Sequence, residues 1–188
     1  MRRLPVLIAA ALLAFPGQGW CAALPAPPQQ MFEAMLLYAE QGDFAKAGRI
    51  LEKLAPLLDE LRAAYGTDLA GETREALKKG GAWEAQTAIL KVVYYHMKLE
   101  LSAALKAEGR SAIGSVRMAY LDYLFLVPRL KDRDKKPAAE AELRFKAVHK
   151  LVISGLAASE MKEEARAQVR EIERICLQAL EAGGKRRV

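Results

Sequence analysis

The sequence contains little of what most catalytic and redox sites need. It has only 2 cysteines and 2 histidines among 188 residues. It contains no CxxCH motif for covalent haem, no HExxH pair for zinc and no glycine-rich phosphate or dinucleotide loop. No serine lies in a GxSxG motif. We therefore expect no catalysis, and we assign no cofactor, metal ligand or catalytic residue from the sequence.

Residues typical of strands are also scarce. Aromatic residues make up 7% of the chain, whereas 52% is apolar and 28% is charged. The remaining composition is dominated by Ala, Leu, Glu, Lys and Arg, which favour helices. This balance is typical of a globular protein with a substantial core. We predict a single all-α domain over residues 31–183, a bundle of six or seven helices built from helical hairpins.

Only one long apolar run is present, and it lies at the amino terminus. Arg2 and Arg3 precede the run at 4–15, which is too short to cross a bilayer, and small residues follow at 21–23. We predict a signal peptide over 1–23 that is cleaved near Ala23, a Pro-rich linker over 24–30 and a disordered basic tail over 184–188. A retained membrane anchor, or a lipoprotein acylated on Cys21, is the alternative.

Cleavage would leave a mildly basic protein outside the cytoplasm, periplasmic or secreted. The formal charge falls from +6 to +4 because two arginines and no acid are lost. Basic residues alternate with acidic ones, so we expect no nucleic-acid partner. No further segment reaches membrane-spanning length, so no stable membrane insertion is expected. Cys176 would be the sole cysteine, and its place on an apolar helical stripe predicts a buried, unreactive thiol.

The stretch 83–108 is predicted to be the central helix. It carries one narrow polar stripe and is apolar on most of its circumference, which requires covering helices on two sides. Leu90, Val93 and Met97 should be buried there, as should Val116, Tyr120 and Leu124 in a later helix. The other helices are expected at 31–41, 44–65, 69–79, 112–127, 137–154 and 160–181, with a kink at Pro56 and an end before Pro128.

Two parts of the sequence resemble each other. AEQGDFAKAGRILEKL and ALKKGGAWEAQTAILKVV align at an offset of about 38, and each has a helix, a glycine turn and a second helix. The first segment resembles one tetratricopeptide hairpin. A stacked array needs at least three units, so two hairpins favour a bundle over a solenoid.

A second resemblance concerns residues 116–155. VRMAYLDYLFLVPRLKDRD, followed by a helix ending in VISG, resembles the helical periplasmic segment of bacterial high-affinity iron permeases. That resemblance implies a link to iron uptake. The Arg-Glu-x-x-Glu motif of that family is absent, because the second glutamate of Arg170-Glu171-Ile172-Glu173 comes one place early.

The polar residues inside the apolar stretches are the candidate site. His96 and Glu100 are four apart on one helix face, which suits either two ligands of one metal ion or a hydrogen-bonded polar pair. Asp122 needs a partner from another helix, and Arg117 cannot provide it along the same face. His149 is the only other histidine. Non-covalent haem through a histidine with Met97 or Met118 is a further alternative.

Two functions remain. The first is a non-enzymatic accessory module that holds a partner protein, its oligomeric state left open. The second is a metal- or small-ligand-binding bundle in which His96, Glu100 and Asp122 converge, with or without His149. The distances between these side chains distinguish the two functions, because ligands of one site must approach within about 5 Å of one another.

Overall fold

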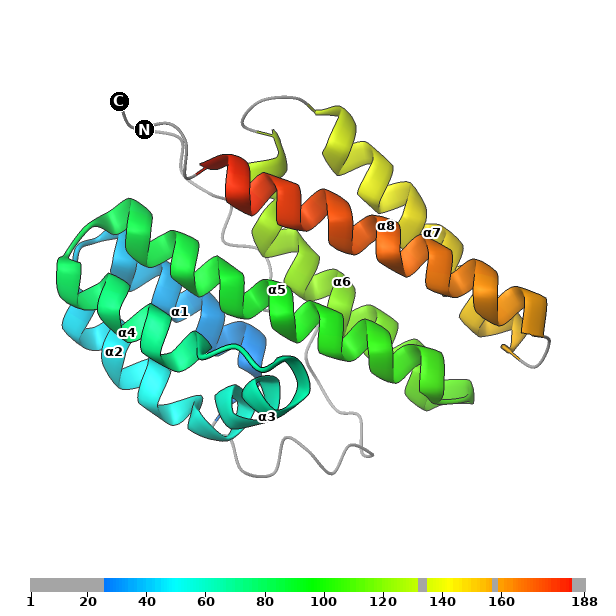
Figure 1. Ribbon diagram of the computed structural model, residues 1–188, viewed down its shortest axis with the longest axis horizontal. Helices are drawn as coiled ribbons and strands as arrows, with labels where there is room; N and C mark the ends of the chain where they lie inside the picture. Colours follow the sequence, from blue (N-terminus) through cyan, green and yellow to red (C-terminus); the bar gives the residue numbers. More distant parts are fainter. Residues whose placement is uncertain (1–25, 132–134, 157–158, 184–188) are drawn as a thin grey trace.

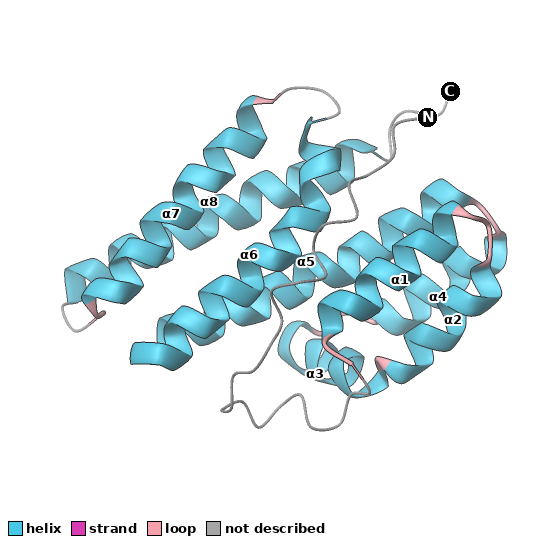
Figure 2. Ribbon diagram, turned by 180° about the vertical axis from the view of Figure 1, so that it is seen from behind, coloured by secondary structure: helices cyan, strands magenta, loops and turns pink. Residues whose placement is uncertain are grey.

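The computed structural model describes residues 26–131, 135–156 and 159–183, and every regular element in these ranges is an α-helix (Figures 1 and 2). The all-α prediction is confirmed, but the described residues form eight helices instead of six or seven. The expected signal peptide and tail lie outside the described residues. The helices are α1 (Pro28–Glu40), α2 (Phe44–Lys53), α3 (Ala55–Tyr65), α4 (Leu69–Lys79), α5 (Ala82–Lys106), α6 (Gly109–Lys131), α7 (Lys136–Ser154) and α8 (Ser159–Gly183).

The additional helix arises at Pro56. The sequence predicted one kinked helix over 44–65, but the chain ends α2 at Lys53 and restarts as α3 at Ala55. Proline has no amide hydrogen and its ring clashes with the carbonyl four residues earlier, so the regular ladder fails here. Leu54 sits at the break and is fully buried, which anchors the corner in the core.

Helix ends follow the local sequence in the first half of the chain. The Asp43 carboxylate accepts a hydrogen bond from the Lys46 amide at 3.1 Å, and Asp68 accepts one from the Gly71 amide at 3.0 Å. The linker prediction was wrong at its end, because α1 begins at Pro28. Proline is well suited to the first turn of a helix, where its missing N–H costs nothing.

The expected end of α6 was also wrong. Instead of spanning 112–127, this helix runs from Gly109 through Pro128 to Lys131. Proline this close to a helix end removes a single backbone hydrogen bond. Side-chain contacts hold the last turn: Leu130 is buried, and the Arg129 guanidinium lies 3.3 Å from the centroid of the Trp83 ring.

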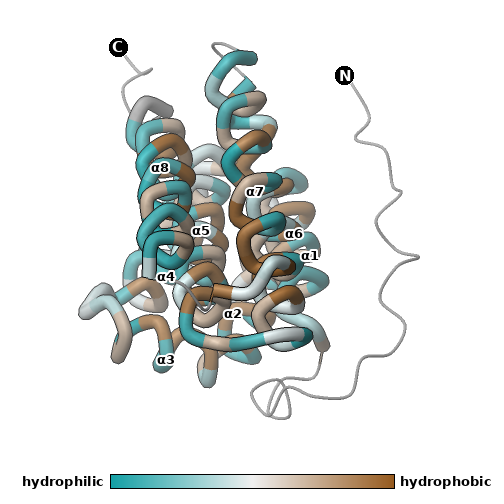
Figure 3. The backbone as a smooth tube through the Cα atoms, turned by 90° about the vertical axis from the view of Figure 1, so that its right-hand side faces the viewer, coloured by the Kyte–Doolittle hydropathy of each residue, from teal (hydrophilic) through white to brown (hydrophobic). Residues whose placement is uncertain are grey.

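The buried side chains form two clusters that share α5. One cluster is built from α1 to α5, and the other from α5 to α8. Figure 1 shows α5 running between these two groups of helices, and Figure 3 shows hydrophobic and hydrophilic positions alternating along α8. Ile89 and Val93 of α5 belong to the first cluster, whereas Leu90 and Met97 belong to the second. The prediction of a central helix covered on two sides is confirmed.

The inward face of α6 differs in part from the prediction. Val116 is buried as expected, but Tyr120 and Leu124 are only half-buried. Tyr123 is buried instead, and its hydroxyl donates to the Ala138 carbonyl at 2.7 Å. That hydrogen bond docks the start of α7 onto α6.

The two segments of similar sequence each pack as a helical hairpin, α1 against α2 and α4 against α5. Helix α1 also packs directly against α5, which closes these helices into a bundle. An open stack would instead leave the first helix of one hairpin beside the first helix of the next. The resemblance to a tetratricopeptide hairpin stays a prediction.

Candidate functional site

A buried polar cluster lies where α1, α5 and α6 meet. The Gln29 Nε2 donates to Asp122 Oδ1 at 2.9 Å, and His96 Nδ1 lies 2.6 Å from Asp122 Oδ2. His96 Nε2 lies 3.9 Å from Glu100 Oε1. Gln29, His96 and Asp122 are at most 5% exposed. We call Gln29, His96, Glu100 and Asp122 together the His96 centre.

Three helices position the centre. His96 lies in the middle of α5, and Asp122 lies on the neighbouring helix α6, so both are carried by long, well-packed elements. Gln29 lies in the first turn of α1, one residue after Pro28. Phe32, one turn further along α1, packs edge-on against the His96 ring with centroids 5.6 Å apart. The amino-terminal helix therefore contacts both members of the His–Asp pair.

The hydrogen bonds define the tautomer of His96. Ionised Asp122 is acceptor-only, so the nitrogen that faces it, Nδ1, carries a hydrogen. The other nitrogen, Nε2, points toward Glu100 across a gap too long for a hydrogen bond. The ring is therefore oriented by one carboxylate and presents its second nitrogen to another.

Burial and charge act in opposite directions on the His–Asp pair. Burial opposes the charged imidazolium, but the charge and hydrogen bond of Asp122 outweigh it, with help from Glu100 and Glu60, and raise the pKa of His96. Burial raises the pKa of Asp122, although His96 and Gln29 both favour its ionised form. The pair is held together by a charge-assisted hydrogen bond in a water-poor environment.

Two further carboxyl groups act electrostatically on this pair. Burial raises the pKa of Glu100, while His96 and a hydrogen bond from the Ser115 hydroxyl oppose that rise. Burial likewise raises the pKa of Glu60 on α3, and the charge of His96 again opposes it. Three carboxyl groups therefore act on one imidazole, and the centre has an acidic surplus.

The structure brings together three of the four expected site residues. His96, Glu100 and Asp122 converge, but His149 is exposed on the outer side of α7 and takes no part. Arg117 is exposed, and Lys98 pairs with Glu173 at 3.4 Å. Across the described part of the chain, no group of three or more His, Cys, Asp or Glu side chains is arranged closely enough to hold a metal ion.

Sequence reasoning missed Gln29 and Glu60. Gln29 was assigned to the linker, although Pro28 is a helix-start signal that would have placed it in a first turn. Glu60 gave no such signal, because an acidic residue on a helix is usually a solvated one. Its effect on His96 comes from the packing of α3 against α5.

Lys98 of α5 contacts residues of both α3 and α8. Its ammonium lies 5.1, 5.7 and 5.8 Å from the ring centroids of Tyr65, Tyr94 and Tyr95. The contact with Glu173 adds α8 to this arrangement. Burial raises the pKa of Tyr65 to about 12, so this ring stays neutral. A lysine among tyrosine rings and a carboxylate is a stabilising contact with every charge matched.

Cys176 is buried, as predicted. Its side chain has no exposed surface, and burial, with the nearby charge of Glu173, raises the pKa of its thiol to about 12. Because the thiolate is the reactive form, labelling with a thiol reagent is expected to be slow in the native protein and fast in denaturant. Fast native labelling, or a band of twice the mass on a non-reducing gel, would contradict this prediction.

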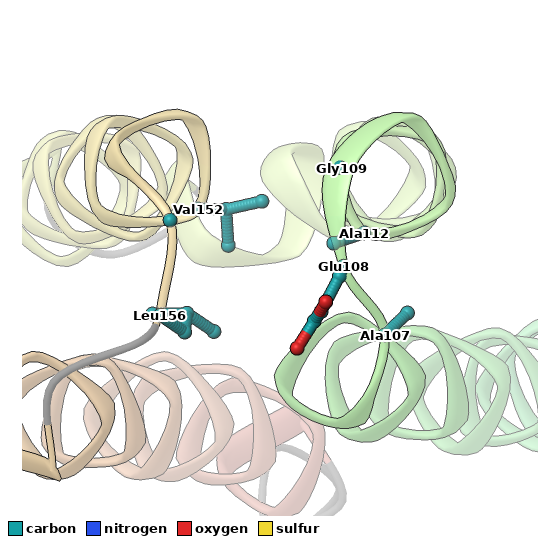
Figure 4. A pocket seen from close by; sticks show the side chains of 7 residues that line it. Ala107, Glu108, Gly109, Ala112, Val152 and Leu156 are labelled. Atoms are coloured by element: carbon teal, nitrogen blue, oxygen red, sulfur yellow. The ribbon is translucent and has the colours of Figure 1, made fainter.

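A cavity lies away from the centre, at one end of the group of helices α5 to α8. It has a volume of about 230 Å³ and is bounded by the α5–α6 turn and the end of α7. Val152, Leu156 and the carboxylate of Glu108 point toward it (Figure 4). Glu108 is exposed to solvent, so the cavity provides no buried polar group to orient a ligand.

Comparisons with protein-family models, curated proteins and solved structures give no match to this chain. Among the helices that the structure describes, none combines the length and apolar character that crossing a bilayer requires. The likeness to the iron-permease segment stays a prediction.

Proposed function

We propose that this protein is an exported, non-catalytic helical binding protein and that the His96 centre takes up a small cation. The signal-peptide pattern at 1–23 supports export to the periplasm or beyond. The convergence of His96, Glu100 and Asp122 supports ligand binding over the alternative of three unrelated polar residues. Ligand binding is preferred to partner holding because His96 lies within about 5 Å of both Glu100 and Asp122, the separation that ligands of one site require.

The observation that carries the proposal is the acidic surplus around a buried imidazole. Burying a charged pair costs several kcal/mol per ion before hydrogen bonds offset it, so stability alone rarely favours such a pair over apolar residues. Shifted pKa values of grouped residues indicate functional sites more often than chance. Here Glu60 and Glu100, when ionised, add negative charge to a pair that is already matched, and burial, by raising the pKa of both carboxyl groups, favours a ligand that would keep them ionised. A cation is the ligand that this charge distribution favours.

Catalysis is not part of the proposal. The Ser115 hydroxyl hydrogen-bonds to Glu100, so it is not presented to the imidazole as a nucleophile. The pair is also too deeply buried for a substrate to reach without opening the helices. A small ion needs a much narrower path, and Glu100, which lies beside His96 Nε2, is partly exposed.

Isothermal titration of the mature protein with zinc, manganese and spermidine tests the proposal. At least one of these cations should bind with a stoichiometry of one, and Glu100→Gln should weaken binding by at least about tenfold. His149→Gln is the matched control for His96→Gln, since His149 is exposed and remote from the centre. No uptake of any cation, or equal uptake by both histidine variants, would contradict the proposal.

Holding a partner protein is the second candidate function, and one observation favours it. Leu143 and Ile153 on α7 are 65% and 58% exposed, and Leu177 on α8 is 38% exposed. Photo-crosslinking side chains at positions 143 and 153 should then capture one defined partner in the periplasm, whereas position 59, an exposed position of α3, should not. Equal products from all three positions would contradict this candidate.

A further inference from the structure

We propose that the outer face of α7 binds the surface of an anionic lipid bilayer. This inference goes beyond cation binding at the His96 centre, and it gives Leu143 and Ile153 a different occupant from the partner protein of the second candidate function. It is carried by a continuous exposed stripe on α7, by the charge of that stripe and by the lysines at its middle.

The exposed stripe follows the helical period along the length of α7. Residues that recur at steps of three and four lie on one face of a helix. The α7 stripe consists of six exposed residues at these steps: Lys136, Ala139, Leu143, Lys146, Lys150 and Ile153. The inward face of α7 is filled by a second series at the same steps: Ala138, Ala141, Phe145, Val148 and Val152. The main contacts of α7 are with α6 and α8, and the helix lies at the outer edge of its group (Figure 1). The α7 stripe is therefore free of the core.

The charge of the α7 stripe has one sign, because its charged members are all lysines. Lys146 pairs at 3.1 Å with Glu142 at the edge of the stripe, and both side chains are largely exposed. An exposed pair of this kind contributes little and exchanges readily for another partner. The exposed side of α8 differs, since it carries both signs, among them Glu163 and Arg166, which pair with each other. The α7 stripe is complementary to a negatively charged surface.

Two aliphatic side chains project from the same stripe. Leu143 is 65% exposed and Ile153 is 58% exposed. They are ten residues apart, which is about 15 Å along the helix axis. A helix that lies on a membrane places such side chains at the boundary between headgroups and acyl chains, and its lysines near the phosphates. Binding of this kind needs no membrane-spanning helix.

The lysines at the middle of the stripe favour a bilayer over a protein as the occupant. Lys146 and Lys150 lie between the two aliphatic side chains. A protein partner that covered both aliphatic side chains would bury these lysines at the centre of its interface, where lysine is depleted. On a bilayer, a lysine keeps its ammonium among the headgroups while its methylene chain covers apolar surface. Each lysine near an anionic leaflet strengthens binding by about fivefold.

Flotation of the mature protein with unilamellar vesicles tests the inference. The protein should bind vesicles made of an equal mixture of phosphatidylglycerol and phosphatidylcholine, and it should not bind vesicles of phosphatidylcholine alone. Binding should weaken as the salt concentration rises, because salt screens the attraction between the lysines and the lipid.

The charge of the stripe is tested by the double variant Lys146→Gln and Lys150→Gln, which should weaken binding about thirtyfold. The matched control is Lys78→Gln with Lys79→Gln, which removes the same charge from exposed positions of α4 in the other group of helices (Figure 1). Lys78, like Lys146, pairs with a nearby glutamate, at 3.3 Å. The control should change binding by less than about twofold, since charges beyond the screening length contribute little.

The apolar part of the stripe is tested by Leu143→Ser with Ile153→Ser, which should weaken binding at least about tenfold. All substituted positions are exposed, so the variants should fold, and circular dichroism would check this. Failure to bind anionic vesicles, equal binding to phosphatidylcholine, or unchanged binding of this serine variant would overturn the inference. Equal losses in the two lysine variants would do the same, because binding would then follow total charge and not the α7 stripe.

The outcomes separate this inference from the proposed functions. Absence of vesicle binding, together with capture of one acidic protein by crosslinkers at positions 143 and 153, overturns the lipid assignment in favour of the second candidate function. The cation titration tests the His96 centre by itself, because the centre and the α7 stripe share no residue. Either result can therefore fail while the other stands.

Discussion

Replacing Asp122 with alanine is expected to lower the free energy of unfolding by about 3–5 kcal/mol, the cost of removing one partner of a buried ion pair. Asp122 is fully buried and accepts hydrogen bonds from both His96 and Gln29. Its removal leaves two buried polar side chains without their partner. Urea denaturation followed by circular dichroism measures the change, and the slope of the transition should stay constant if the native state is intact.

Two controls show whether this loss comes from unpaired polar groups. Asp59→Ala makes the same substitution at an exposed position of α3 and should change stability by no more than about 0.5 kcal/mol. Replacing Gln29, His96 and Asp122 together by leucine removes the centre entirely and should recover most of the loss. If Asp122→Ala costs less than about 1 kcal/mol, the cluster is wetter than its burial indicates.

The single-helix features of the fold could be predicted from the sequence. Helix starts at Asp43 and Asp68 follow from side-chain capping, and the ends at Gly66 and Gly80 use the left-handed backbone that glycine adopts without strain. These signals act within a few residues, so no tertiary information is needed to recognise them.

The errors in the helix boundaries at Pro56 and Pro128 came from prolines whose effect depends on packing. Pro56 was expected to bend one helix but divides it, since buried Leu54 holds the corner between α2 and α3. Pro128 was expected to stop α6, yet Arg129 stacks on Trp83 and Leu130 enters the core, so the helix continues. The local sequence is alike in both cases, and contacts with other helices decide the result.

As with the fold, the sequence predicted only those features of the candidate site that lie on a single helix. The spacing of His96 and Glu100 on α5 reveals one face of the centre. The approach of Asp122 and Gln29 depends on how α5, α6 and α1 are placed, which a period along one helix does not contain. His149 shows the converse: it follows the buried Val148 by one position, and that rotation of about 100° turns it to solvent.

Replacing Leu90 with alanine should cost about 2–5 kcal/mol, the range for a large-to-small change at a buried site. Leu90 is 4% exposed and belongs to the cluster of α5 to α8, one residue from Ile89 in the other cluster. A cavity there weakens the helix on which both clusters depend, so the loss should appear as one cooperative transition at lower urea. Leu143→Ala, at a 65% exposed position of α7, should change stability by no more than about 0.5 kcal/mol. Two separate transitions, or a loss below about 1 kcal/mol, would mean that α5 does not couple the two clusters.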